Sequence, residues 1–510
     1  MEQSTRTAAK QSMCYNVTSA SSYAGVHMES PIATSFLYSR AIWAIGLLVA
    51  IVITRMITAK PKALAGTKSL PQIPGLPYIG APWGVPVPGA ESAWHFAELH
   101  KKYGPIYAWE VFGTYHVWIE SDKIARDLLV PLMNIGDNFW RHKNFIHALN
   151  RQANAENIFF GYPELENKNT LRRLLDHPDK WSEHIITRCS RVAGRIAWGD
   201  PRHGTKLLHV VPVLLKAVSP SGPIVNLLTP LMNLPDSISP WKKAEARRRQ
   251  QMQDTFYEAQ EDVMKQYEEG TAEGSWTKLW LEKAQGLEKS HLDKHEAAHA
   301  VGSNALVAIV TIGSPVRCVT THPGYPGYKR RSIGHEPEMF PEADEWRPER
   351  RLDPSWPTYK EPLSEYPTIR GDPGFGYGIR SCPGIDLVMT ELYTTIGSIA
   401  WGFHIRRKEG KAGYENPVPW YETNSYVITI ASQFPADVTP RSEEKARIIQ
   451  QLTEDPSLTV KATGEKSEGQ SGRWDVYRPD EDSGLTFDWE GMTQQAPNHN
   501  KGLRAYLVGV

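Results

Sequence analysis

The chain has 510 residues, of which 40% are hydrophobic and 22% are charged, and its 57 basic side chains balance its 57 acidic ones. This composition is typical of a globular protein, and the balance excludes the basic surplus of a nucleic-acid-binding protein. The four cysteines are widely spaced and form no CxxC pair: Cys14, Cys189, Cys318 and Cys382. We therefore expect no disulfide framework and a reducing compartment for the main domain.

An apolar segment at residues 36–57 predicts a transmembrane signal anchor. Its uninterrupted apolar run extends from Ala41 to Ile53, and with the arginines that flank it the segment reaches the length of about 20 residues that spans a bilayer. A cleaved secretory signal is the alternative, because Ala63-Leu64-Ala65 resembles a cleavage site, but the run begins far from Met1. Basic residues follow the span, which favours a lumenal segment 1–35 and a cytoplasmic main domain.

The segments on either side of the anchor are predicted to be a lumenal N-terminal segment and a proline-rich linker. The sequon at Asn16 would be a glycosylation site if residues 1–35 are lumenal, and an unused sequon is the alternative. Residues 58–90 contain six prolines between Leu70 and Gly89. Because proline removes a backbone donor and fixes φ, this stretch predicts a stiff, extended linker.

Helices are predicted to dominate residues 91–450. The exception is a β-hairpin, predicted from strand-like runs at 106–112 and 115–120 that meet at a Gly-Thr turn. Long helices are then predicted over 240–270 and 292–312. The predicted fold is therefore mainly α, with small β-sheets.

The C-terminal part is predicted to contain one more core helix and a polar tail. Apolar residues recur there at intervals of four, four and three residues, which predicts a helix with one side on the core. These residues are Val388, Leu392, Ile396 and Ile399. Residues 451–510 are polar and are expected to form a tail outside the domain.

Cys382 lies in the glycine-rich stretch FGYGIRSCPG, directly before that helix. A thiolate at a helix N-terminus is stabilised by free N–H groups and by the helix dipole, so this cysteine is suited to bind a metal. Arg380 could bind an anionic group of a ligand, and Phe375 could cover the sulfur. Three glycines would let a flat ligand approach the backbone: Gly376, Gly378 and Gly384. Together these roles describe a macrocycle that carries carboxylates; a buried structural cysteine in a turn is the alternative.

The stretch matches all six fixed positions of the haem-binding signature of cytochromes P450, and the chain therefore resembles that family. Residues 334–354, GHEPEMFPEADEWRPERRLDP, are similar to the family's segment before the haem loop, in which Arg350 would be the structural arginine. The anchor, the linker and residues 101–129 resemble the N-terminal third of fungal microsomal members. The resemblance covers most of residues 36–450 and implies a cytochrome P450-like fold with an N-terminal transmembrane helix.

The resemblance implies a haem-thiolate monooxygenase in which Cys382 is the axial ligand of the iron of haem b, iron protoporphyrin IX. Such an enzyme inserts oxygen from O2 into an apolar small molecule, with electrons from NADPH through NADPH–cytochrome P450 reductase. Trp140 and Arg141 resemble the residues that contact a haem propionate, and Thr311 is the candidate for the proton-relay threonine. The implied location is the endoplasmic reticulum membrane, with a single span and a cytoplasmic catalytic domain. The fungal resemblance favours a tailoring step in secondary-metabolite biosynthesis.

The sequence departs from the family pattern at several positions. Val310 stands in place of the acid that precedes the threonine, so Thr311 could instead bond only to its own helix. Asn144 stands where an arginine is usual. No Glu-x-x-Arg pair occurs between Ile312 and Phe340, and the chain is short there and between Leu129 and Trp140. An incomplete gene model, a decayed copy and a diverged protein remain open.

A zinc-protease pattern, HEAAH, is the rival motif. His295 and His299 would lie on one helical face as metal ligands, with Glu296 as the general base. Ala305 stands where the extended motif has a third histidine, so polar residues on a helix are the simpler interpretation. Three functions are thus weighed: a haem monooxygenase, which we favour, a zinc metallohydrolase, and a degenerate P450-like membrane protein that binds no haem.

Overall fold

The computed structural model describes most of residues 70–321 and 336–454. The larger gaps within these ranges lie at 86–91, 130–136, 364–371 and 408–435. The chain divides into two compact units, Met1–Lys62 and Ala63–Val510, and the elements below all belong to the second unit.

The predicted anchor, residues 36–57, lies mostly outside the described residues, and so does the sequon at Asn16. Four residues of the anchor are described and are helical and exposed: Trp43, Gly46, Leu47 and Ala50. Among the described residues, only Lys294–Val316 forms a helix long and apolar enough to cross a membrane, and 67% of its most apolar window is buried inside the fold. Because a core helix also has this length and composition, the anchor stays a prediction.

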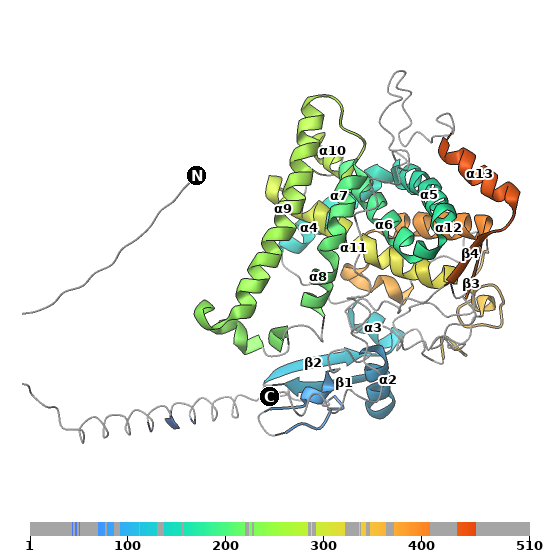
Figure 1. The fold of residues 1–510 in the computed structure, drawn as a ribbon. Coiled ribbons are helices and arrows are strands. Elements are labelled where there is room, and N and C mark those ends of the chain that lie inside the picture. The colour runs from blue at the N-terminus through green and yellow to red at the C-terminus, as the bar shows by residue number, and fades with distance from the viewer. Residues whose placement is uncertain are drawn as a thin grey trace, which may run out of the picture. The chain divides into compact units, whose positions relative to one another are not determined.

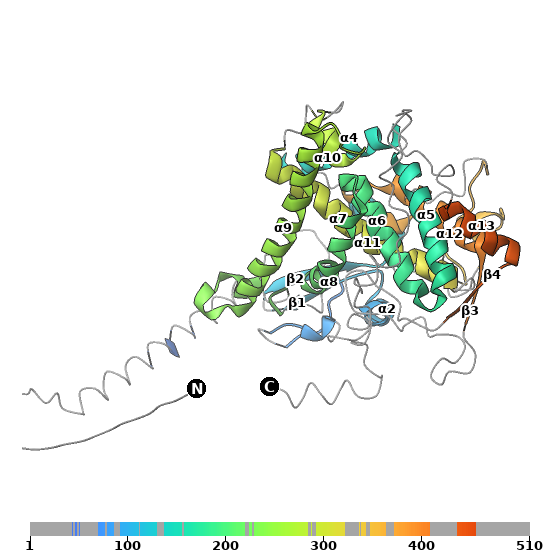
Figure 2. The ribbon, with the colours of Figure 1, turned by 45° about the horizontal axis from the view of Figure 1, so that its top comes forward.

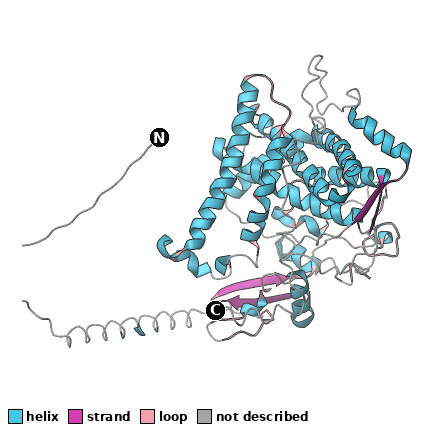
Figure 3. Ribbon diagram, viewed as in Figure 1, coloured by secondary structure: helices cyan, strands magenta, loops and turns pink. Residues whose placement is uncertain are grey.

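Helices form most of the described fold, as predicted (Figure 1, Figure 3). The long helices are α4 (Asp137–Ala155), α5 (Ile158–Asp176), α6 (Trp181–Trp198), α9 (Pro240–Glu268), α11 (Lys294–Thr321) and α12 (Ile385–Gly402). The shorter ones are α2 (Ser92–Tyr103), α3 (Asp122–Leu129), α7 (Pro201–Lys206), α8 (Val211–Val218), α10 (Trp276–Leu281) and α13 (Glu443–Glu454). Short 3-10 turns include η8 (Pro348–Arg351), η9 (Pro373–Phe375) and η10 (Gly378–Arg380). The predicted helices over 240–270 and 292–312 are confirmed as α9 and α11, and α11 continues to Thr321.

Two small antiparallel sheets complete the described elements. Strands β1 (Ile106–Val111) and β2 (Thr114–Ile119) form the predicted hairpin, with Val111 opposite Thr114 at the turn. Gly113 has φ +82°, a conformation that glycine adopts without strain and that a tight hairpin turn requires. Strands β3 (Phe403–Arg407) and β4 (Ala436–Pro440) form the second pair.

The main hydrophobic core surrounds α11, which packs with α4, α6, α9 and α10 (Figure 2). Ala298 and Ile309 of α11 are fully buried. The helices meet so closely that a Cβ at Gly302 would lie 2.3 Å from the ring of Phe256 on α9. This position therefore requires glycine, and α11 is fixed at the centre of the fold.

A second core joins α5, α6, α12 and α13 with β3 and β4, which lie together in both views (Figure 1, Figure 2). Leu174 of α5, Ile399 of α12 and Ile449 of α13 are among its most deeply buried side chains. Because α13 reaches Glu454 and buries Ile449, the folded unit includes the first residues that we assigned to the polar tail. The rest of that tail lies outside the described residues.

The predicted helix after the cysteine is confirmed as α12, but its buried side differs from the prediction. The fully buried residues are Leu387, Glu391, Thr395, Ile399 and Gly402. Val388 and Leu392, which belong to the predicted stripe, are only partly buried against the second core. The buried side of the helix is therefore shifted by about one residue from the predicted one. The polar side chains of Glu391 and Thr395 are buried where the apolar pattern had predicted their neighbours Leu392 and Ile396.

Candidate active site

The cysteine loop, residues 372–384, is folded by two 3-10 turns and two glycines. Gly376 has φ +75° and Gly378 has φ +56°, values that side chains with a Cβ rarely adopt. The N–H of Cys382 donates to the carbonyl of Phe375 at 2.8 Å and so closes the loop. Two of the three predicted glycine positions thus serve the backbone directly.

The sulfur of Cys382 is half-buried beside the first turn of α12. The N–H of Gly384, the N-cap residue of α12, donates to this sulfur at 3.3 Å. Burial raises the pKa of the Cys382 thiol, and the Gly384 hydrogen bond offsets only part of that rise. The predicted stabilisation by the helix N-terminus is therefore present but smaller than the effect of burial, so a bound metal cation would have to ionise the sulfur.

Helix α4 runs along the cysteine loop and holds two of its carbonyls. The ammonium of Lys143 donates to Ile379 O at 2.6 Å, and the side-chain amide of Asn150 donates to Pro383 O at 2.8 Å. The ammonium also lies 5.6 Å from the ring centre of Trp140, which is half-buried. The sequence analysis did not name Lys143. Its position one helical turn after Trp140, which was expected near a haem propionate, could have indicated that it lies at the same site.

The two arginines that we assigned to haem carboxylates are placed differently. Arg380 is exposed on the loop, whereas Arg141 donates to Glu296 of α11 at 3.0 Å. Burial lowers the pKa of Lys143, and the neighbouring guanidinium of Arg380 lowers it further. Lys143 and Arg380 are therefore like charges whose repulsion an anion between them would relieve. Asn144 is exposed and supplies no charge.

The other side of the loop is anchored by a buried tyrosine. Tyr377 donates to Asp122 of α3 at 2.6 Å, and Asp122 also accepts from Arg126 at 2.8 Å. The carboxylate of Glu336 accepts from the backbone N–H of Asp122 at 3.0 Å and from the hydroxyl of Ser121 at 2.9 Å. Two segments far from the loop in sequence, α3 and the segment of Glu336, thus hold this side of the loop, and no local sequence pattern predicted these contacts.

Helix α11 carries Thr311 and Val307 on an exposed face, although the helix is central to the core. Val307 is 49% exposed, an apolar surface that a flat apolar ligand could cover. The hydroxyl of Thr311 donates to the carbonyl of Val307 at 2.9 Å. Val310, in the place of the family's acid, is buried in the core. Thr311 thus bonds to its own helix, and its catalytic role stays a prediction.

Arg350 holds the segment before the loop through backbone carbonyls. Its guanidinium donates to Pro341 O at 3.0 and 2.9 Å and lies 5.4 Å from the ring centre of Trp356. Its own carbonyl accepts from Thr358. The contracted stretch 322–335 lies outside the described residues. Arg350 thus contacts residues near it in sequence, and its structural role in the haem loop stays a prediction.

The zinc motif finds no third ligand among the described residues. His295 and His299 are exposed on α11, and the ring centre of His295 lies 4.9 Å from that of Tyr257. Glu296, the candidate general base, is occupied by Arg141. Polar residues on the first turns of a helix account for the motif.

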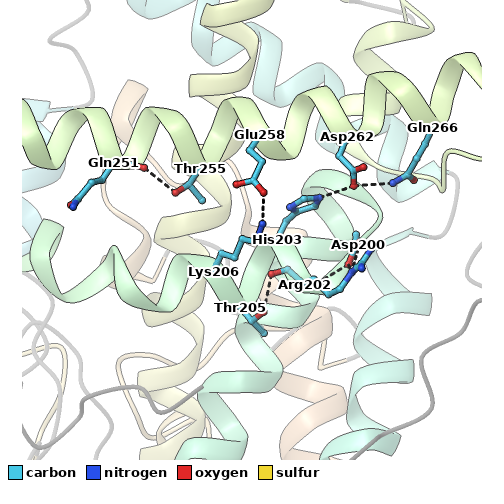
Figure 4. A network of polar contacts seen from close by, with 10 residues as sticks. All are labelled: Asp200, Arg202, His203, Thr205, Lys206, Gln251, Thr255, Glu258, Asp262 and Gln266. Carbon is cyan, nitrogen blue, oxygen red and sulfur yellow. Dashed lines mark hydrogen bonds and ion pairs between the residues drawn. The ribbon is translucent and has the colours of Figure 1, made fainter. Parts of the chain in front are cut away.

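One other group in the described part of the chain has ligand atoms at metal-binding spacing: Asp200, His203 and Asp262 (Figure 4). The carboxylate of Asp200 is already held by the guanidinium of Arg202 at 2.5 and 2.9 Å. Asp262 accepts from Gln266 at 3.0 Å and lies 3.1 Å from Nε2 of His203. These bonds indicate that the group links α7 to α9 and is not a metal centre.

Comparison with known proteins finds distant relatives over most of the chain. No family model matches the chain. The chain is 24% identical to cytochrome P450 monooxygenase claR of Ampulloclitocybe clavipes, over 76% of this chain and 89% of that protein. It is 21% identical to cytochrome P450 monooxygenase 58 of Postia placenta, over 82% of this chain and 97% of that protein. This chain is a distant homologue of fungal cytochrome P450 monooxygenases over most of its length, and we call it this P450 on that ground. A shorter match to cytochrome P450 monooxygenase psoD of Aspergillus fumigatus, 36% identical, covers 22% of this P450 and 23% of that protein.

The alignments also bear on the predicted contractions. The match to P450 58 extends over 536 positions, more than the 510 residues of this P450, of which it covers 82%. The relative therefore has residues inside the aligned region that this P450 lacks. These relatives are monooxygenases, and haem is the cofactor that their family implies. A half-buried sulfur, glycine turns and two neighbouring cations fit an iron porphyrin with carboxylates.

Proposed function

We propose that this P450 is a membrane-anchored haem-thiolate monooxygenase that inserts an oxygen atom from O2 into an apolar small molecule. The observation that carries the proposal is the geometry of Cys382, whose sulfur accepts the Gly384 N–H at 3.3 Å at the start of α12. A backbone donor at this place is suited to a sulfur that carries negative charge on a metal. When bound, haem supplies the activation of oxygen, and the chain supplies position and protons.

Each described residue of the site then has a defined task. Cys382 would hold the iron, and Phe375, half-buried at the start of the loop, would shield the sulfur from water. Lys143 and Arg380 would bind the haem carboxylates, because their charges lie beside the loop and repel one another. Trp140 would pack near this edge beneath the Lys143 ammonium.

Thr311 is the proposed proton-handling residue of α11. Because its hydroxyl proton is given to Val307 O, its oxygen offers lone pairs on the exposed face of the helix. A water molecule held there could pass a proton towards the substrate side. Proton transfer on this helix would depend on the Thr311 hydroxyl alone, because the neighbouring Val310 has no titratable group.

The substrate class and the cellular setting are further parts of the proposal. The relatives are fungal P450 monooxygenases, which favours a tailoring step on an apolar secondary metabolite. Electrons would come from NADPH through a membrane-bound reductase. Residues 36–57 would anchor this P450 in the endoplasmic reticulum membrane, with Asn16 in the lumen and available for glycosylation.

The test is the absorbance spectrum of the purified full chain after supply of haemin. We expect stoichiometric haem and the red-shifted band of the reduced carbon-monoxide complex, and we expect Cys382→Ala to lose that band entirely. Cys189→Ala is the matched control, because this second described free cysteine is buried in the second core, which includes no residue of the loop. A colourless wild-type protein would overturn the proposal in favour of the haem-free alternative, and stoichiometric zinc would favour the hydrolase.

A further inference from the structure

Helix α12, which follows the cysteine loop, carries a buried carboxyl group in its second turn. Glu391 is 2% exposed, and its Oε2 lies 2.5 Å from Nη1 of Arg188 on α6, whose side chain is fully buried. A buried pair of this kind adds little stability compared with apolar residues of similar volume. Its best-attested use is to specify one arrangement among several that apolar packing alone would allow.

The contact extends to a third helix. Nε of Arg188 donates to the side-chain oxygen of Asn167 on α5 at 2.6 Å. The hydroxyl of Thr395, one turn beyond Glu391, donates to the same oxygen at 3.2 Å. We call these four residues, Arg188, Glu391, Asn167 and Thr395, the α12 clamp. It ties two successive turns of α12 to α5 and α6.

The geometry of the clamp restricts how α12 can rotate. Glu391 and Thr395 are four residues apart and so lie on one face of the helix. A shift of one residue would turn that face by about 100° and remove both side chains from their partners. The apolar neighbours Val388 and Leu392 do not impose such a restriction, because apolar packing is non-directional.

The position of the cysteine sulfur follows from this rotation. Gly384 is the N-cap of α12, so its N–H moves with the helix. That N–H is the donor that contacts Cys382 at 3.3 Å. The clamp lies in the second and third turns, and the sulfur lies just before the first.

We propose that the α12 clamp sets the rotation of α12 and thereby aims the Gly384 N–H at the Cys382 sulfur. Arg188 and Glu391 are thus positioning residues for the metal ligand. The inference rests on the proposed haem-thiolate function, but its structural part concerns the chain itself. It also accounts for the polar residues on the buried side of α12.

A neighbouring buried cluster supplies the matched control. Glu166 of α5 is fully buried and accepts from Arg191 at 2.8 Å and from Arg195 at 2.7 Å, both on α6. This cluster resembles the clamp in burial and charge, and its ion pairs join α6 to α5. A change there tests burial and stability without acting directly on the cysteine loop.

The first experiment measures hydrogen exchange of the haem-free full chain, read from peptides that span the cysteine loop and the start of α12. The test variant is Arg188→Met combined with Glu391→Leu, which leaves no unpaired buried charge and is expected to keep a melting temperature near that of the wild type. We expect exchange at the loop to rise by on the order of tenfold in this variant. Glu391→Gln, which keeps an acceptor for Arg188, should restore the wild-type rate.

Glu166→Gln should lower the melting temperature and leave exchange at the loop unchanged. Unchanged exchange in the double variant would overturn the proposal, and so would an equal rise in Glu166→Gln, because either result would make the effect one of general stability. If the double variant does not fold, faster loop exchange in Asn167→Ala supports the clamp and unchanged exchange overturns it.

The second experiment measures the reduced carbon-monoxide spectrum after loading with haemin. We expect the double variant to bind haem but to lose the red-shifted band in most of the bound fraction, while Glu166→Gln keeps it. A wild-type band in the double variant would overturn the proposal. If the wild type itself binds no haem, the proposed function fails, while the exchange experiment still decides whether the clamp positions the loop.

Discussion

The cysteine loop and the central helix α11 carry two different parts of the chemistry proposed for this P450. In the loop, Gly376 and Gly378 adopt positive φ, and the Gly384 N–H reaches the sulfur of Cys382. In α11, Val310 is buried in place of the acid, and Thr311 donates to its own helix. The loop thus keeps the residues proposed to hold a cofactor, whereas α11 lacks the acid proposed to deliver protons. We therefore expect haem binding and turnover to be separable in this chain.

The largest expected effect is on the loop side and concerns Glu120, which follows β2. Its carboxyl is 1% exposed, and burial raises its pKa to about 8. The folded state therefore binds a proton that the unfolded state, with an ordinary carboxyl pKa, has released above about pH 5. Stability is then lost as the pH rises towards 8, by an amount on the order of 2–4 kcal/mol.

The measurement is denaturant unfolding between pH 5 and pH 9 for the wild type and Glu120→Gln. We expect the variant to flatten this part of the stability profile and to be the more stable protein at pH 8. Glu110, half-buried in β1, offers the control substitution Glu110→Gln. A wild-type slope that survives in Glu120→Gln would show that another group titrates. Asp122, two residues after Glu120, accepts the hydrogen bond from Tyr377 of the cysteine loop. We therefore expect Glu120→Gln also to keep the cysteine loop folded at alkaline pH.

The second-largest expected effect is on haemin affinity, and it tests whether the cysteine loop binds an anionic cofactor. Lys143→Met removes the ammonium that lies beside Arg380 and bonds Ile379 O. We expect haemin affinity to fall by about tenfold, which corresponds to about 1.4 kcal/mol. Lys101→Met is the control, because the exposed Lys101 pairs with Glu98 on α2 and should not affect binding. Haemin titration followed by absorbance gives both affinities, and equal values would remove Lys143 from the site.

The smallest effect is expected on α11. Thr311→Ala removes a hydroxyl that donates to Val307 O and Ala308 O of its own helix. We expect haem affinity within about twofold of the wild type and a loss of oxygenation smaller than the factor of about 100 typical of a general acid or base. A loss of haem binding in this variant would break the separation between the two regions. Product formation and haemin titration measured on one preparation decide it.

The local elements of the fold could be predicted because their causes lie within a few residues of sequence. A turn glycine between two alternating runs specifies the β1–β2 hairpin, and helical periodicity specifies α9, α11 and α12. The cysteine loop is of the same kind, since its glycines act on their own backbone. The departures at Val310 and Asn144 were equally readable, because each concerns the residue itself.

Only the tertiary structure decided which side chains meet. In the fold, Arg141 pairs with Glu296 and Lys143 bonds to the cysteine loop. Tyr377 bonds to Asp122, and α12 is oriented so that Glu391 is buried. These partners are far apart in sequence. The periodic pattern of a helix does not show whether one of its polar residues will find a hydrogen-bond donor elsewhere in the chain. Sequence thus determined the turns, the helices and the ligand loop, because backbone propensity is local. Packing decided the charges and hydrogen bonds around that loop, because their energies depend on burial and on partners that only the folded chain assembles.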